Sequence, residues 1–454
     1  MSDGVKEGKK QFRLTTTQII PLVFAAIILL GGIVLTLPIA SRGGVSCGFR
    51  SALFTATSAT CVTGLVLFDT WTQWSGFGQA VILCLIEIGG LGFMAVASLA
   101  VFMLRRKAGL KQRMLMAQAW SVEDMSAVVR LQKWVLLGSL TIQLAGALIL
   151  FLRFMPAYGW RQSAVWAVFH AVSAFCNAGF DITGSIAPGA NLIVFNKDPV
   201  VLITVMALIV IGGLGFFVWQ ELVTVHNFRK YSVYTKLVLI TTACLIVCGA
   251  LAICILEWKN PATLGALDTP HKILNGFFQS VTVRTAGFTS VDQAALTDGG
   301  KAVSIILMLI GGSSGSTAGG AKTVTFVVLM LFVFSRARGK NAVTVFKRNV
   351  PAGRIMDAAT IVGLMVGLAT LGAVFIVATS PVDFTDALFE TVSALATVGL
   401  TAGVTTSLSI PAQWLIMLFM YFGRVGILTI SLGFLMGNQA ENRFRYANTN
   451  LLIG

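Results

Sequence analysis

Charged residues are scarce in this chain, where they make up 11% of 454 residues against 56% hydrophobic residues. Such a composition leaves too little polar surface to cover a soluble core, so it excludes a soluble globular protein. The three histidines, His170, His226 and His271, belong to different segments and form no cluster that an enzyme embedded in a membrane would use. The seven cysteines show neither a disulfide framework nor the spacing of metal ligands.

Long apolar runs are abundant instead, and each approaches the ~20 residues that a membrane-spanning helix needs. Basic residues precede the first run, but its full spanning length and the lack of a small-residue cleavage signature indicate a retained helix, not a signal peptide. The sequence therefore predicts an all-α, multi-pass membrane protein with eight spans. The eight runs are residues 19–39, 80–104, 134–154, 200–222, 237–256, 303–309 continuing as 324–334, 358–378 and 414–435.

Lysine and arginine gather before the first run, in every second loop and after the last run. These loops are residues 105–133, 229–236 and 336–354. The positive-inside rule assigns that side, with both termini, to the cytoplasm, so we expect a cell inner (plasma) membrane location. This topology explains most of the net charge of +15. Membrane lipid or an acidic cytosolic partner is thus a better expectation for the basic face than nucleic acid.

One phrase occurs four times: a Phe, then ten residues later a Gly followed by Leu or Phe. The four glycines, Gly64, Gly179, Gly287 and Gly399, lie 115, 108 and 112 residues apart. Because each phrase falls between two apolar runs, the chain divides into four repeats of two spans each. We place them at residues 1–130, 131–232, 233–353 and 354–454.

Each phrase contains an element about half as long as a membrane span. These elements cover residues 49–59, 164–175, 271–281 and 383–395, begin on the outer side and lead into the repeated Gly. Non-helical backbone at membrane depth is tolerated only where it is buried in protein or lines a wet cavity. The sequence therefore predicts four pseudo-symmetric repeats of helix, pore loop and helix around one central pore, as in potassium channels.

Side chains vary at the ends of the four pore loops, whereas the Gly is constant, which indicates that backbone carbonyl oxygens bind a monovalent cation. Ser58, Ser173 and Ser393 lie six residues before the Gly in three repeats; they either brace the loop by hydrogen bonds or, as we expect, only pack. The predicted filter residues are Val62, Thr63, Gly64, Asn177, Ala178, Gly179, Thr285, Ala286, Gly287, Thr397, Val398 and Gly399.

A second glycine motif follows each pore loop. The first two copies, at residues 89–92 and 212–215, are typical of close helix packing. The third is longer and should break its helix in mid-span, so we predict a movable intramembrane gate there. It resembles a phosphate-binding loop, but Ala321 separates Gly320 from Lys322 and no strand precedes it, which argues against nucleotide binding. The predicted gate residues are Gly311, Gly312, Ser313, Ser314, Gly315, Ser316, Thr317, Ala318, Gly319, Gly320, Lys322 and Arg424.

Arg424 stands in the fourth copy where the other copies have Gly. A charge inside a span is costly and indicates function. We expect Arg424 to face the pore axis and to pair with carbonyl oxygens of the gate or with Glu87; a structural ion pair is the alternative, and Lys322 can share either role.

Together, the four pore loops, the Gly-rich break and the motif around Arg424 resemble the Trk/Ktr/HKT superfamily of potassium transporters over nearly the whole chain. With eight spans, the chain is most similar to the Ktr membrane subunits (KtrB). The resemblance implies a homodimer with one pore per protomer, activation by sodium, and a cytosolic ring subunit of the KtrA type that binds ATP or ADP. It implies no cofactor on this chain, and Gly64 favours potassium over sodium. Arg284 and Val281 depart from the other loops, and the role of Arg284 stays open.

Two other classes of protein compete with this prediction. A cation symporter that couples potassium to sodium or protons would also have Gly-interrupted spans, but it usually has paired acids at mid-membrane, and here only Glu87 qualifies. An enzyme is not expected, since no catalytic cluster is found.

Overall fold

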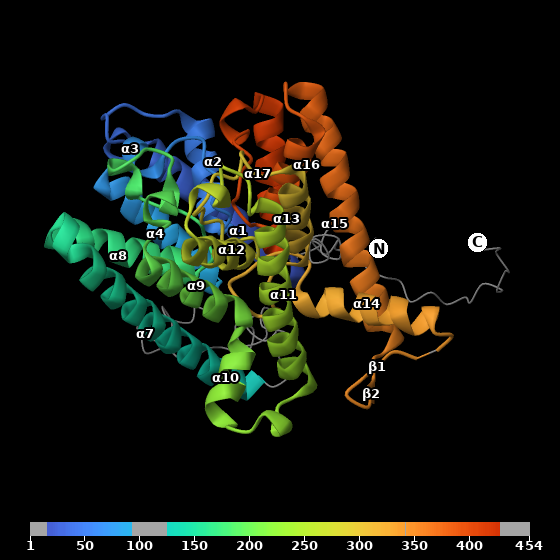
Figure 1. The fold of residues 1–454 in the computed structure, drawn as a ribbon. Helices are drawn as coiled ribbons and strands as arrows, with labels where there is room; N and C mark the ends of the chain where they lie inside the picture. Colours follow the sequence, from blue (N-terminus) through green and yellow to red (C-terminus); the bar gives the residue numbers. More distant parts are fainter. Residues whose placement is uncertain (1–15, 93–124, 341, 427–454) are drawn as a thin grey trace, which may run out of the picture.

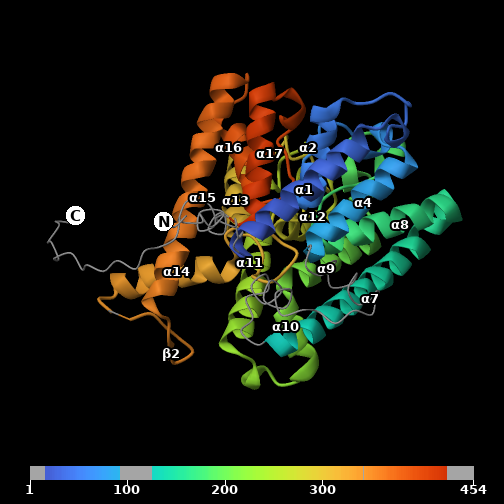
Figure 2. The same ribbon diagram turned by 180° about the vertical axis from the view of Figure 1, so that it is seen from behind.

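The structure is a computed structural model that describes residues 16–92, 125–340 and 342–426 (Figures 1 and 2). Nearly all regular structure in these ranges is helical, as the sequence predicts. The one sheet there is a hairpin of β1 (Thr344–Val345) and β2 (Arg348–Asn349), which pair antiparallel. The predicted basic residues before residue 16, at 105–113 and at 443–445 lie outside the described ranges.

A long apolar helix opens each repeat: α1 (Thr16–Thr36), α7 (Met125–Tyr158), α11 (Val233–Glu257) and α15 (Ala352–Thr379). Within the described residues these four are long and apolar enough to cross a membrane on their own. Large apolar side chains such as Leu144, Ile255 and Leu371 lie exposed on them, which fits a lipid environment and would be unfavourable in water.

A shorter helix packs against each long one: α2 (Phe49–Thr60), α8 (Trp160–Phe175), α12 (Thr269–Thr282) and α16 (Phe384–Leu395). These are the predicted half-length elements, here called pore helices. α8 begins four residues earlier than the predicted residue 164. Gly159, with φ +74°, turns the chain between the end of α7 and the start of α8.

The second span is broken in the third repeat, as predicted, and also in the second repeat, where we predicted a straight run. The described helices of the second spans are α4 (Gly76–Leu91), α9 (Pro199–Leu214) with α10 (Phe216–Thr224), α13 (Asp298–Ile310) with α14 (Thr323–Ala337), and α17 (Ile410–Val425). The chain bends by 95° between α9 and α10. α14 lies across the long helices instead of continuing α13 (Figure 1). The predicted runs 80–104 and 414–435 continue outside the described residues.

The reason for these interruptions is the second glycine motif, which ends a helix in every repeat. The residue after each helix is a glycine with positive φ: Gly92 (+81°), Gly215 (+98°), Gly311 (+69°) and Gly426 (+95°). The close packing that we predict for the first two copies is present, because a Cβ on Gly90 would approach the Sγ atom of Cys176 to 2.6 Å. The helix ends at these two copies were not predicted.

The four repeats close into a ring. The second-span helices α4, α9 and α13 pack against the pore helix of the following repeat, and α17 packs against α2 of the first. This cyclic order brings the four pore-helix C-termini toward one axis. Short elements complete the described chain: η1 (Pro38–Ala40), α3 (Thr70–Gln73), η2 (Thr183–Ser185), η3 (Asn191–Phe195), η4 (Phe228–Lys230), η5 (Leu264–Ala266) and η6 (Thr405–Ser407).

Candidate functional site

Four loops of the same backbone shape follow the pore helices. They cover residues 62–64, 177–179, 285–287 and 397–399, and we call them the glycine loops. The first residue of each has positive φ although none is Gly: Val62 (56°), Asn177 (59°), Thr285 (72°) and Thr397 (51°). For β-branched residues this conformation is strained and persists only where surrounding structure imposes it, which is typical of functional sites.

The third residue of each loop, Gly, also has positive φ, between 70° and 97°. It meets the neighbouring loop in a closed cycle. A Cβ on Gly64 would collide with the carbonyl oxygen of Ala178, and a Cβ on Gly179 would lie 2.8 Å from that of Ala286. Gly287 faces the carbonyl oxygen of Val398 in the same way, and Gly399 faces that of Thr63. The backbone oxygens of all four loops therefore lie side by side, with no room for a side chain.

Hydrogen bonds that hydroxyl groups accept or donate brace the loops. The backbone N–H of Gly64 donates to Ser58 Oγ at 3.0 Å, and that of Gly399 donates to Ser393 Oγ at 3.1 Å. Ser173 Oγ donates to the carbonyl oxygen of Phe180 at 2.8 Å. In the third repeat Thr282, the neighbour of Val281, donates to Phe288 O at 2.6 Å. The serines thus do more than pack, contrary to our expectation.

Electrostatics also favour a cation at this point. Each pore helix ends one or two residues before its glycine loop, with C-caps at Cys61, Cys176, Val283 and Ala396. The C-terminus of a helix carries a partial negative charge from its unpaired carbonyl groups. Four such ends converge on the space enclosed by the glycine loops.

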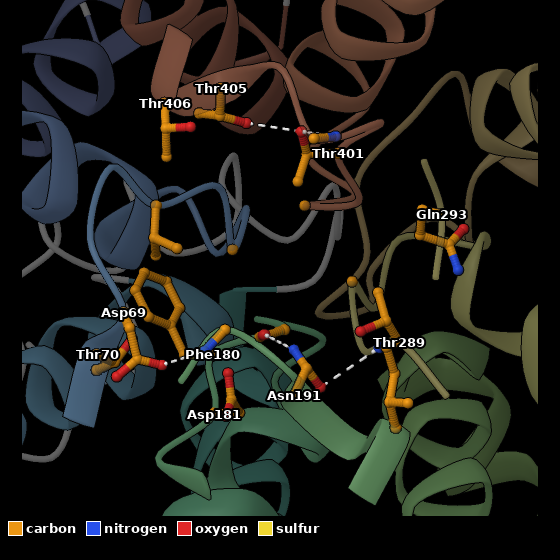
Figure 3. A pocket seen from close by; sticks show the side chains of 18 of the residues that line it. Asp69, Thr70, Phe180, Asp181, Asn191, Thr289, Gln293, Thr401, Thr405 and Thr406 are labelled. Carbon is orange, nitrogen blue, oxygen red and sulfur yellow. Dashed lines mark hydrogen bonds between the residues drawn. The ribbon is translucent and has the colours of Figure 1, made fainter. Parts of the chain in front are cut away.

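A cavity of about 340 Å³, which we call the mouth, opens beside the glycine loops and is lined by the residues that follow them. Residues of all four repeats line it, as the loops surrounding the centre of Figure 3 show. Asp69 and Asp181 give it negative charge. Asp69 accepts a hydrogen bond from Gly189 N at 3.0 Å, so repeats 1 and 2 are joined here. Burial raises the pKa of Asp181 to about 6, against hydrogen bonds from Thr183 that lower it.

The Gly-rich segment, residues 311–322, is an irregular loop between α13 and α14. Its Thr317 Oγ1 donates to the carbonyl oxygen of Phe175 at 3.1 Å, and Ser313 N donates to that of Gly213 at 3.1 Å. A Cβ on Gly319 would lie 2.6 Å from the carbonyl oxygen of Ala396, which directly precedes the fourth glycine loop. The segment therefore lies against the C-terminal ends of the pore helices of repeats 2 and 4.

Arg424 connects this segment with the first repeat. Its guanidinium donates to the carbonyl oxygens of Thr317, Gly89 and Gly90, the last at 2.9 Å. We predicted that Arg424 pairs either with carbonyl oxygens of the gate or with Glu87, and the structure shows hydrogen bonds to carbonyl oxygens. Lys322 Nζ donates to Ala318 O at 2.5 Å within the segment itself.

Two other charged residues, the half-buried Glu87 and the buried Arg284, lie apart from Arg424. Glu87 accepts hydrogen bonds from Gln143 Nε2, at 3.1 and 3.2 Å, and from Cys176 Sγ at 3.4 Å. Arg284, 7% exposed, lies behind the third glycine loop, where its Nη2 is 3.5 Å from Thr242 Oγ1 on α11. Arg284 therefore does not line the mouth.

Sequence reasoning missed the polar residues of the mouth. Asp181 follows Gly179 by two residues, and this position was a usable signal. Glu390, on α16 behind the mouth, gave no signal because an acid inside a short amphipathic helix looks like a surface residue. Among the described residues no three His, Cys, Asp or Glu side chains gather to hold a metal ion.

Comparison with known proteins agrees with this geometry. The chain is 40% identical to the Ktr system potassium uptake protein B of Bacillus subtilis, over 96% of each chain. It is 38% identical to the potassium/sodium uptake protein NtpJ of Enterococcus hirae, over 97% of this chain and 98% of that one. The crystal structure of the potassium transporter TrkH from Vibrio parahaemolyticus has the same fold, with a TM-score of 0.71 at 18% identity over 93% of this chain and 86% of that one. The family model described as "TrkH: Cation transport protein" matches residues 6–446, so the chain belongs to the TrkH family of cation transport proteins.

Proposed function

We propose that the chain is the membrane subunit of a Ktr-type potassium-uptake system and conducts potassium down its electrochemical gradient. The observation that carries this proposal is the ring of four glycine loops, in which backbone oxygens of all repeats lie side by side. Such a ring can replace the hydration shell of a monovalent cation. The names of the relatives from B. subtilis and E. hirae support potassium as the ion.

In this proposal the glycine loops are the selectivity filter and the Gly-rich segment is the gate. Arg424 would hold the gate closed, since it joins the segment to the carbonyl oxygens of Gly89 and Gly90. Opening would require those hydrogen bonds to break. The positive charge of Arg424 would also raise the barrier to cations that leave the filter.

We further propose a partner on the cytoplasmic side. The relative from B. subtilis is named as part of a system, which supports a multi-component transporter. A cytosolic ring of the KtrA type, with ATP or ADP bound to it, would dock on the basic loops 226–236 and 336–354 and on 105–133, most of which lies outside the described residues. Activation by sodium, a homodimer and a cell inner membrane location with cytoplasmic termini belong to the same proposal.

A coupled symporter is the second candidate. It is favoured by Glu87, a half-buried acid on α4 whose hydrogen-bond partners, Gln143 and Cys176, are uncharged. A channel-like protein would move rubidium without a fixed ratio to sodium or protons. A symporter would show a fixed ratio that Glu87→Gln abolishes.

Potassium-uptake complementation in a deficient cell, with and without a co-expressed ring subunit, tests substrate and partner together. We expect growth at low potassium that depends on the ring subunit. Lack of rubidium uptake by the purified full-length chain in liposomes, with or without the ring subunit, would contradict the proposal.

A further inference from the structure

Glu390 is a fully buried acid on the fourth pore helix, directly after Phe389 of the repeated phrase. The equivalent residues of the other repeats are Thr55, His170 and Phe278, so an acid occurs at this position only in repeat 4. The residue is 0% exposed. A buried carboxylate is stable only where donors or a cation compensate for the lost water.

The surrounding side chains compensate only one of the two carboxylate oxygens of Glu390. One oxygen, Oε1, accepts a hydrogen bond from the hydroxyl of Thr405, which lies 2.9 Å from the hydroxyl of Thr401. The other oxygen, Oε2, has no hydrogen-bond partner in the described part of the chain. Lys301 does not balance the charge, because it is paired at 2.6 Å with Asp386, one turn earlier on α16.

Glu257 shows how a buried acid looks when its role is structural. It is also 0% exposed and lies on the outer side, at the end of α11. Its two oxygens accept four hydrogen bonds: from Thr297 N at 2.9 Å, Thr297 Oγ1 at 2.6 Å, Asn260 Nδ2 at 2.7 Å and Thr263 Oγ1 at 2.8 Å. Glu390 has one such donor. A negative charge on Glu390 would therefore need something else to balance it.

The space beyond Thr405 is the mouth. Thr401, Thr405 and Gly399 line that cavity, as Figure 3 shows for the two threonines, and the Oε1 atom of Glu390 lies directly behind Thr405. A cation that approaches the fourth glycine loop through the mouth would be separated from the carboxylate by the side chain of Thr405. Two unit charges separated by one side chain interact strongly in a partly buried site.

We propose that Glu390 supplies the negative charge that holds a monovalent cation on the repeat-4 side of the mouth, and so sets the affinity with which cations reach the filter. The hydrogen bond from Thr405 orients the carboxylate toward the mouth, although the carboxylate itself is covered by protein. The inference rests on the proposed function, because it needs cations to pass this way.

The test is rubidium uptake by the purified full-length chain in liposomes, comparing Glu390→Gln with the native chain. Glutamine keeps the shape and an acceptor oxygen for Thr405 but removes the charge. We expect the KM for rubidium to rise by at least about tenfold, because at an effective dielectric constant of about 20 a unit charge within about 12 Å contributes that much or more. The maximal rate should stay within about twofold, because only binding of the entering ion is weakened. Glu390→Asp, which keeps the charge, should largely restore the native KM.

Glu257→Gln is the matched control, and its KM should equal that of the native chain even if the protein unfolds at a lower temperature. An unchanged KM in folded Glu390→Gln, or a fall in maximal rate alone, would overturn the inference. If the native chain takes up no rubidium, the proposed function fails instead. If Glu390→Gln does not fold, anomalous scattering from thallous ion in native crystals decides: we expect a site beside Thr401 and Thr405, and its absence overturns the inference.

Discussion

Replacing Gly64 with serine should weaken the discrimination of potassium from sodium. Gly64 has φ +97°, a backbone conformation that residues with a Cβ rarely adopt. A Cβ at this position would collide with the carbonyl oxygen of Ala178 and lie 3.3 Å from the Cα atom of Gly179. Either the first glycine loop or the second must move, and both would contribute oxygens to the same ion.

The size of the effect follows from the strain. Holding a non-glycine residue in such a conformation costs about 1–3 kcal/mol. If relief of that strain displaces the carbonyl oxygens that bind potassium, up to the same free energy is lost from potassium binding relative to sodium. This corresponds to about a 5- to 150-fold loss of selectivity.

Rubidium uptake into liposomes, measured against competing sodium and competing potassium, gives the selectivity ratio directly. Gly44→Ser is the matched control, because Gly44 has φ +66° but a Cβ added to it would meet no heavy atom within 4 Å. It should lower stability and leave selectivity unchanged. Native selectivity in folded Gly64→Ser would refute the reasoning.

Three further variants probe other parts of the site. Arg424→Gln, measured in liposomes without the ring subunit, should raise rubidium flux several-fold, because the hydrogen bonds to Thr317, Gly89 and Gly90 weaken. Deletion of the Gly-rich segment should also raise the flux. Unchanged or lower flux in either variant argues against the gate. Burial raises the pKa of Asp181 to about 6, so acidifying the outside from pH 7.5 to 5.5 (about two units around that pKa) should protonate its carboxylate and remove a negative charge from the mouth. The KM for potassium should therefore rise, and it should rise less in Asp181→Asn. An identical rise in the variant and the native chain excludes this carboxyl as the source. Ser58→Ala leaves the N–H of Gly64 without its acceptor and should cost about 1–3 kcal/mol of stability in thermal unfolding, together with some selectivity; a variant as stable and selective as the native chain would show that the brace is dispensable.

The architecture was predictable from the sequence because its signals are local and repeated four times. Apolar runs gave the long helices, and the spacing of Phe and Gly gave the pore helices to within a few residues. The ends of α4 at Leu91 and of α9 at Leu214 were not predicted, because Gly-Gly in an apolar run is equally typical of close packing and of a helix end. Only the contact with Ser313 and Thr317, far along the chain, shows that Gly212 and Gly213 lie beside an irregular segment.

The candidate site was predictable in its backbone and not in its polar side chains. The positive φ of Val62 and Thr285 contradicts the local preference of β-branched residues, so only the ring of neighbouring loops can impose it. The sequence predicted two alternative partners for Arg424, carbonyl oxygens of the gate or Glu87. In the structure Arg424 donates to carbonyl oxygens. The pairing of Glu390 with Thr405 depends on how the chain after the fourth loop folds back, which no spacing indicates.

The central claim is that backbone oxygens of the four glycine loops bind potassium on one axis. Anomalous scattering from rubidium in crystals of the full-length chain tests it most directly. The account predicts rubidium on the axis between the loops, coordinated by carbonyl oxygens of residues 62–64, 177–179, 285–287 and 397–399. Rubidium bound only by side chains elsewhere, with none on this axis, would contradict it.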